Sequence, residues 1–453
     1  MTIQSIMKFD LDFKELVRGS GASFTFRIAG MLFGYISTML MTRFFGADAL
    51  GCLMIASIVV EISGIFGRFG TNIALLRLTA EHYAGNQIGR IRDIYLKIIS
   101  MITPVSLLLT TAIFMFSREI AVICFGKEQL TPYIRIAALM IFPVVLNFIH
   151  QEGLRGLKKI NDYSFLKFTV ENLLMTLVLA AAVLFCRNEY MPVISYVSAS
   201  FGACLIGIIL WVLRSRILST GSIETYSRSG ILGIALPLML ANSLVFLMGS
   251  IDTLILGILG STKDVGIYSV AIKVSRLVSI TQMAVNSISA PKFAEMHARG
   301  DISGLDRITR QSNLLIFWTS VPALLFLVLF PGFTLDYFFG SEFRIGAAAM
   351  LILCTGNIFD AATGSVISLM QMTGRQVAFQ NIAFLATAVN VILNWLLIPA
   401  FGINGAALAN FSSIVTLNLC SVIYLYRKYG ILSIYLPFIK VGVKGRSPAR
   451  KNE

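Results

Sequence analysis

A repeated series of apolar stretches constrains the fold of this chain more than any other feature. About a dozen stretches, each close to the ~20 residues that cross a bilayer, follow one another almost from end to end. Residues of the first half recur 214 positions later: Gly46 with Gly260, and the run Phe125–Glu128 with Phe339–Glu342. Two copies of a helical half predict two lobes that rock against each other, which is the architecture of a transporter.

The composition indicates that the bilayer is the solvent. Of the 453 residues, 56% are hydrophobic and only 13% are charged. A soluble domain carries about 25% charged residues, and a soluble fold has too little interior to hide this much apolar surface. The chain is therefore expected to be an integral membrane protein.

The expected spans define the domain organisation. They lie at residues 19–42, 49–76, 94–116, 131–153, 164–186, 190–213, 230–259, 265–290, 311–335, 345–372, 376–399 and 405–426. Six spans in each half is an even number, so both halves begin on the same side and the repeat is parallel. We predict an all-α protein with twelve transmembrane helices in two six-helix lobes around a central cavity. Its parts are a leader (1–18), an N-lobe (19–213), a linker (214–229), a C-lobe (230–426) and a basic tail (427–453).

The basic residues predict the orientation. About 26 Lys and Arg residues fall in one set of loops and termini, and about 6 fall in the opposite set. Because cytoplasmic loops are enriched in Lys and Arg, both termini are expected in the cytoplasm. The net charge of +14 then reflects topology and contact with membrane lipids, and no separate basic domain suggests nucleic-acid binding.

No pattern in the sequence indicates an enzyme. The three His and six Cys residues form no metal-binding or catalytic spacing, and there is no Walker loop or GxSxG motif. The expected loops are about 15–20 residues at most, within the range of simple connections. We expect no catalytic residues, no metal and no cofactor, although H⁺ or Na⁺ could couple to transport.

Ionisable residues inside the spans are the candidate site. A charged group at the middle of a bilayer costs at least about 2.5 kcal/mol, so each should face protein or water. Glu61 and Arg68 are seven residues apart on one helix face, and Lys273 and Arg276 are three apart on another. The candidates for a translocation path are Arg27, Glu61, Arg68, Glu171, Asp252, Lys273, Arg276 and Asp360. The alternative is that these groups pair with one another and only lock helices together.

Three segments resemble a known superfamily. They are Thr42-Arg43-Phe44-Phe45-Gly46, Gly266-Ile267-Tyr268-Ser269-Val270-Ala271, and the run from Asn394 to Ala407. Their order and spacing resemble polysaccharide exporters of the multidrug/oligosaccharidyl-lipid/polysaccharide (MOP) superfamily, above all the O-antigen and capsule flippases.

That resemblance implies a MATE-like fold and a substrate of undecaprenyl-pyrophosphate-linked oligosaccharide. The substrate would move from the cytoplasmic to the periplasmic leaflet of the bacterial inner membrane. A polysaccharide polymerase and a chain-length regulator are the implied partners. Arg27 is similar to the first-helix arginine of the lipid II flippases, and Lys273 lies near their eighth-helix arginine.

Three functions remain in competition at this point. In a lipid-linked oligosaccharide flippase, the basic candidates would contact phosphate, and the acidic ones would pair with them or carry a coupling proton. In a cation-coupled multidrug exporter, acidic groups would dominate the cavity. The ionisable residues within the spans, which are the eight candidates and Arg135, are instead mixed, with five basic and four acidic groups. A membrane-embedded polymerase or glycosyltransferase would need a larger exposed loop than any expected here.

Overall fold

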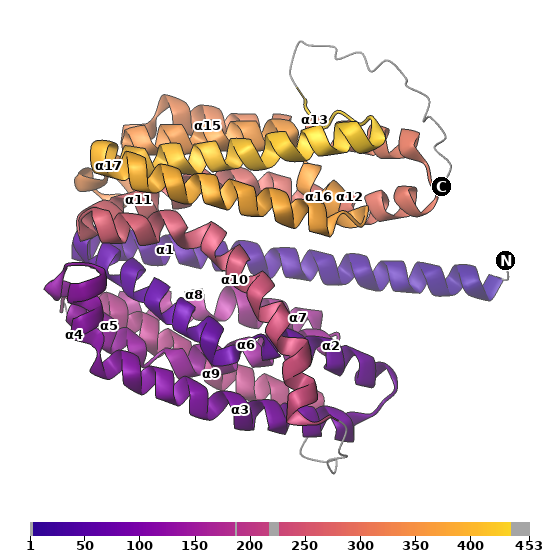
Figure 1. Cartoon of the computed structure of the whole chain (residues 1–453), viewed down its shortest axis with the longest axis horizontal. Helices are drawn as coiled ribbons and strands as arrows, with labels where there is room; N and C mark the ends of the chain where they lie inside the picture. Colours follow the sequence, from indigo (N-terminus) through magenta and orange to yellow (C-terminus); the bar gives the residue numbers. More distant parts are fainter. Residues whose placement is uncertain (1–2, 186–187, 217–225, 436–453) are drawn as a thin grey trace. The chain divides into compact units, whose positions relative to one another are not determined.

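The computed structural model describes residues 3–185, 188–216 and 226–435, and every regular element among them is a helix (Figure 1). The chain divides into two compact units, Met1–Ser250 and Ile251–Glu453. Most of the expected linker lies outside the described residues. The all-helical class is confirmed, while the expected lobe boundaries stay a prediction.

Seven helical segments are long and apolar enough to cross a membrane, or eight if one bent pair counts as a single span. The bent pair is Glu128–Ala138 with Ile141–Gly156, at 47°. The seven are Ser23–Arg68, Ile88–Met115, Ile160–Phe185, Met191–Ser215, Ile302–Leu329, Ser341–Thr363 and Gln376–Tyr429. These counts cover the described residues, where Arg228–Met239 and Gly249–Leu259 form shorter apolar helices.

Two of these segments are too long for one crossing. Ser23–Arg68 has 46 residues and Gln376–Tyr429 has 54, whereas about 20 are enough. Each contains one non-helical glycine, Gly46 (φ 82°) and Gly402 (φ 54°). Glycine is suited to both positions because it lacks the Cβ that disfavours positive φ. The expected division near residues 399–405 thus falls at Gly402, and the total of twelve helices stays a prediction.

The first unit is built around the long helix α1 (Ile3–Arg68), which packs against η3, α6 and α8. The other elements of this unit are α2 (Thr71–Ala84), α3 (Ile88–Met115), α4 (Ser117–Glu119), η1 (Ile120–Cys124), η2 (Glu128–Leu130), α5 (Thr131–Ala138), α6 (Ile141–Gly156), α7 (Ile160–Ser164), η3 (Phe165–Val170), α8 (Glu171–Phe185), α9 (Met191–Ser215) and the first part of α10 (Arg228–Leu259).

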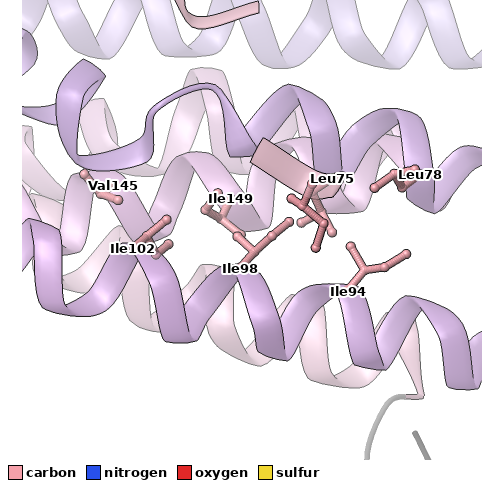
Figure 2. Close-up of a cluster of buried hydrophobic side chains, with 8 residues drawn as sticks. Leu75, Leu78, Ile94, Ile98, Ile102, Val145 and Ile149 are labelled. Atoms are coloured by element: carbon pink, nitrogen blue, oxygen red, sulfur yellow. The ribbon is translucent and has the colours of Figure 1, made fainter. Parts of the chain in front are cut away.

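Aliphatic side chains fill the centre of the first unit. Leu75 and Leu78 of α2 meet Ile94, Ile98 and Ile102 of α3, with Val145 and Ile149 of α6 beside them (Figure 2). The α3 residues are four apart, so they line one face of that helix. Ile231 belongs to the same cluster, and the start of α10 is therefore anchored in this unit.

The second unit continues from Ile251 with the end of α10. Its elements are α11 (Thr262–Ser275), η4 (Arg276–Val278), α12 (Ser279–Ala298), α13 (Ile302–Leu329), α14 (Pro331–Phe339), η5 (Ser341–Gly346), α15 (Ala347–Thr363), α16 (Val366–Met372) and α17 (Gln376–Tyr429). α15 packs along α17 and α13, and α12 along α13.

The repeat seen in the sequence recurs in the elements. α3 and α13 both begin and end 214 residues apart, at Ile88 and Ile302 and at Met115 and Leu329. The glycines of the repeated run, Gly126 and Gly340, both have positive φ, and a 3₁₀ helix follows each. These equivalent elements of the two halves therefore share their backbone conformation.

Three spans expected to be continuous are interrupted. The span 49–76 breaks at Gly70 (φ 80°), 345–372 breaks at Gly364 (φ 65°), and 265–290 passes through the 3₁₀ turn η4. A Cβ on Gly70 would overlap the carbonyl oxygen of Ala235, and one on Gly364 would overlap the side chain of Asn313. These close approaches come from residues distant in sequence, so hydropathy alone could not reveal the breaks.

Candidate functional site

Asp252 is the centre of a buried polar cluster in the second unit. Its side chain is 3% exposed, and four neutral groups donate to its carboxylate. The donors are Asn390 Nδ2 (2.8 Å) and Asn394 Nδ2 (2.9 Å) to Oδ1, and Asn410 Nδ2 (2.6 Å) and the Tyr268 hydroxyl (3.2 Å) to Oδ2. Neutral donors stabilise a carboxylate without cancelling its charge.

The cluster joins three helices and retains spare acceptor capacity. Asn390 and Asn394 precede the break at Gly402 in α17, and Asn410 follows it, so Asp252 pins both halves of that helix. The Oδ1 atom of Asn394 is buried and has no hydrogen-bond partner among the described residues. Carboxylate and amide oxygens are the ligand types that hard cations prefer.

Asp360 sits in a second amide network. Asn418 Nδ2 donates to Asp360 Oδ1 (3.0 Å), and the Thr363 hydroxyl donates to Asn418 Oδ1 (2.9 Å). Gln282 Nε2 donates to the carbonyl of Gly364 at the adjacent helix break (3.1 Å). The carboxylate is half-buried and has an amide as its hydrogen-bonded neighbour.

The two basic candidates of the second unit differ in exposure. Lys273 is half-buried on α11, whereas Arg276 is exposed at the start of η4. Tyr268 lies within electrostatic range of both Arg276 and Asp252, and its hydroxyl donates to the latter. Tyr268 is therefore a direct neighbour of the acidic candidate Asp252.

In the first unit, the structure brings Glu61, Arg68 and Glu171 together. Glu61 lies within electrostatic range of both other groups, and all three are half-buried. The Arg68 guanidinium stacks 4.1 Å from the centroid of the Phe148 ring, and its Nη1 atom is buried with no hydrogen-bond partner in the part of the chain that the structure describes. An arginine so placed has donor capacity left for an anion.

Arg27 lies on α1 beside the π-helical segment η3. Its guanidinium is 4.9 Å from the centroid of the Phe168 ring. Two features fix α1 against η3: Thr169 Oγ1 donates to the carbonyl of Phe26 (2.8 Å), and Gly30 packs so closely that a Cβ would overlap the Phe168 carbonyl. π-helical turns are rare and frequently mark functional sites.

Several residues of these clusters were not among the sequence-based candidates. Asn410 and Tyr268 share the Asp252 cluster, and Phe148 and Phe168 carry the two arginines. The four-residue spacing of Asn390 and Asn394 was a visible signal, because it places both amides on one helix face. Nothing in the sequence indicates which rings would meet the arginines.

Comparison with known proteins identifies the family. Residues 40–346 match the family described as "Polysaccharide biosynthesis protein". The chain belongs to this family. Two similar relatives come from Haloferax volcanii: the probable low-salt glycan biosynthesis flippase Agl15, 24% identical over 191 residues, and the probable flippase AglR, 26% identical over 177 residues. The matches cover 42% and 38% of this chain, and about two-fifths of each relative's length (40% and 37%).

Solved structures of transporters share the fold. The lipid II flippase MurJ, in an inward closed conformation, aligns with a TM-score of 0.73 over 92% of this chain and 90% of its own, at 14% identity. An inward-facing MATE multidrug transporter of the MOP superfamily aligns equally well (0.73; 89% and 95%; 13% identity). This member of the polysaccharide biosynthesis family is therefore a multi-pass membrane protein that shares the fold of these two transporters.

Proposed function

We propose that this chain is a flippase for a polyprenyl-pyrophosphate-linked oligosaccharide. The repeat unit of an O-antigen, capsule or exopolysaccharide moves from the cytoplasmic to the periplasmic leaflet as the two lobes alternate in access. The protein resides in the bacterial inner membrane with both termini in the cytoplasm. A polysaccharide polymerase with its chain-length regulator receives the flipped unit.

The observation that carries this proposal is the environment of the guanidinium groups of Arg27 and Arg68. Both guanidinium groups stack on aromatic rings, and among the described residues neither forms a direct ion pair with a carboxylate, although Glu61 lies within electrostatic range of Arg68. A membrane-embedded cation is costly unless it meets an anion. A stacked guanidinium keeps its N–H edge available for charge-assisted hydrogen bonds to phosphate. An anionic substrate fits these two groups better than a cationic drug.

The acidic groups of the second unit suit a coupling ion. Asp252 and Asp360 have amide and hydroxyl partners, which leave their negative charge uncancelled. In this proposal Asp252 takes up H⁺ or Na⁺ and releases it during the transport cycle. Neutralising the carboxylate weakens its four hydrogen bonds, and the ends of α10 and α17 can then separate.

The experiment is a flipping assay in proteoliposomes. A fluorescent short-chain polyprenyl-pyrophosphate oligosaccharide is incorporated, and a membrane-impermeant quencher reports the accessible fraction. The intact protein should make nearly all of the label accessible within minutes, whereas protein-free liposomes keep about half protected. Flipping no faster than in protein-free liposomes would refute the proposal.

A second candidate function follows from the equal fit to the MATE transporter. As a multidrug exporter, the protein would move a cationic dye across the same liposomes when an H⁺ or Na⁺ gradient is imposed. Dye transport with no flipping of the pyrophosphate lipid would favour this second function.

A further inference from the structure

We propose that α6, α7 and η3 form a docking site for the pyrophosphate group of the lipid-linked substrate, using Arg155 and Lys167 together with Arg27. This inference rests on the proposed function and adds Arg155 and Lys167 to the candidate residues. From the sequence, these two residues contributed only to the expected orientation.

Two adjacent aromatic rings, those of Tyr163 and Phe168, form cation–π contacts with the three basic side chains. The rings of Tyr163 and Phe168 meet edge to face, with centroids 6.4 Å apart. Arg27 lies 4.9 Å from the Phe168 centroid, Arg155 lies 5.6 Å from that of Tyr163, and Lys167 lies 5.1 Å from Tyr163 and 5.8 Å from Phe168. Stacking on rings favours the cations without consuming the N–H groups at their edges.

The charges of this cluster do not balance. Glu152, whose side chain is 9% exposed, lies 3.3 Å from Arg155 and 3.8 Å from Lys167. Asp162, the residue before Tyr163, is occupied by Arg214, whose Nε and Nη2 donate to it at 2.6 and 3.2 Å. Among the described residues, the cluster thus holds one buried carboxylate and three cations: Glu152 lies beside Arg155 and Lys167, and Arg27 joins them through the Phe168 ring. The excess of two positive charges matches the charge of a pyrophosphate diester, which is about −2 at neutral pH.

The backbone builds the site before any ligand arrives. The π-helical turn η3 carries Lys167 and Phe168, and the close contact of Gly30 with Phe168 brings α1 against it. Lys167 Nζ donates to the Tyr163 hydroxyl (2.8 Å), and Ser23 and Ser164 share a hydrogen bond (2.5 Å) between α1 and α7. A cation held in advance loses little side-chain entropy when it binds.

An apolar stripe on α1 indicates that the phosphate belongs to a lipid. Ile28, Leu32 and Ile36 are 37%, 59% and 43% exposed, and they repeat every four residues from the position after Arg27. Residues with this spacing line one helix face. A lipid pyrophosphate at the cluster would place its isoprenoid chain along this stripe, whereas a soluble phosphate has no apolar chain to contact it.

The test measures binding of three probes to the full-length protein in nanodiscs: farnesyl pyrophosphate, inorganic pyrophosphate and farnesol. Farnesyl pyrophosphate should bind, with an affinity that falls steeply with salt because binding releases counterions from charged groups. The double variant R155Q/K167Q should weaken that affinity at least tenfold. The matched control K158Q/K159Q removes two lysines of the same connection and should change it less than twofold.

Each outcome decides the proposal. The proposal is overturned if farnesol binds as tightly as farnesyl pyrophosphate, or if R155Q/K167Q binds farnesyl pyrophosphate as tightly as the unaltered protein does. It is also overturned if farnesyl pyrophosphate does not bind to the unaltered protein. Inorganic pyrophosphate that binds as tightly as the farnesyl compound overturns the lipid assignment. The flipping assay separates this inference from the proposed function: normal flipping by R155Q/K167Q would overturn the docking site and leave the flippase intact.

Discussion

The side-chain amide of Asn410 donates a 2.6 Å hydrogen bond to the carboxylate of Asp252, 158 residues earlier in the chain. It is the shortest of the four bonds that hold this carboxylate, and it reaches across the break at Gly402 from the second half of α17. The end of α10 and the two halves of α17 are thereby fixed around one charge.

Replacement of Asn410 by Leu should therefore cost about 2 kcal/mol of unfolding free energy, since a hydrogen bond to a charged group contributes roughly 1.5–3 kcal/mol. Denaturant titration in mixed micelles measures this change. Ser412→Ala is the control on the same helix, because the Ser412 hydroxyl bonds only to the carbonyl of Leu408 within α17. Equal stabilities of the two variants would contradict a stabilising role for the Asp252 cluster.

Asp252→Asn should abolish the coupling of transport to an ion gradient while the protein still folds. The variant keeps the shape of the side chain and removes its charge, so a proton or Na⁺ gradient should no longer accelerate flipping. The rate with and without an imposed gradient, in the same proteoliposomes, is the measurement. A gradient response as large as that of the unaltered protein would exclude Asp252 as the coupling group.

Arg27→Gln and Arg68→Gln should each lower the flipping rate at least tenfold while the protein still inserts in the membrane. Gln keeps a polar side chain but lacks the positive charge and the paired N–H donors of the guanidinium group. Lys263→Gln is the control, because Lys263 is exposed and lies 3.7 Å from Glu342 in a surface pair of small worth. If all three variants flip at the same rate, the membrane arginines do not contact substrate.

Gly30→Ala tests the contact that brings Arg27 to η3. A Cβ at this position would overlap the carbonyl of Phe168, so α1 or η3 must shift and stability should fall by 2 kcal/mol or more, roughly the range of overpacking. Gly233→Ala, where nothing lies within 4 Å of the added Cβ, should instead stabilise α10 by about 0.5–1 kcal/mol. Thermal unfolding in detergent distinguishes the two, and similar midpoints would count against the close packing.

Periodic and local features of this fold could be predicted from its sequence, and the site only in part. Hydropathy indicated the spans, and the 214-residue repeat anticipated the matching bounds of α3 and α13. The carbonyl of Ala235 approaches the break at Gly70 closely from about 165 residues away, and no local pattern encodes this approach. The π-helical turn at Lys167 and Phe168 likewise leaves no signature in an apolar run. The proximity of these two residues to Arg27 could therefore not be predicted from the sequence.

The segment after α17 gives a final test, centred on Asn313. This buried side chain donates to the Ser433 hydroxyl (3.0 Å) and accepts from the backbone N–H of Ser365 (3.0 Å), at the break between α15 and α16. Tyr435 extends the same contact, because its N–H donates to the carbonyl of Ala362 (2.8 Å). The segment 430–435 thus holds the break closed from one side.

Asn313→Ala should leave the Ser365 N–H buried without an acceptor, at a cost of about 1–3 kcal/mol, whereas the Ser433 hydroxyl keeps its bond to the carbonyl of Thr363 (3.0 Å). Because Gly364 and Ser365 form the turn between α15 and α16, proteolysis near residues 364–365 should also accelerate. Thr319→Ala, an exposed change on the same helix whose hydroxyl bonds only within α13, should alter neither stability nor cleavage. Unchanged cleavage in Asn313→Ala, measured by limited proteolysis in nanodiscs, would mean that the break is held by α17 and not by the segment that follows it.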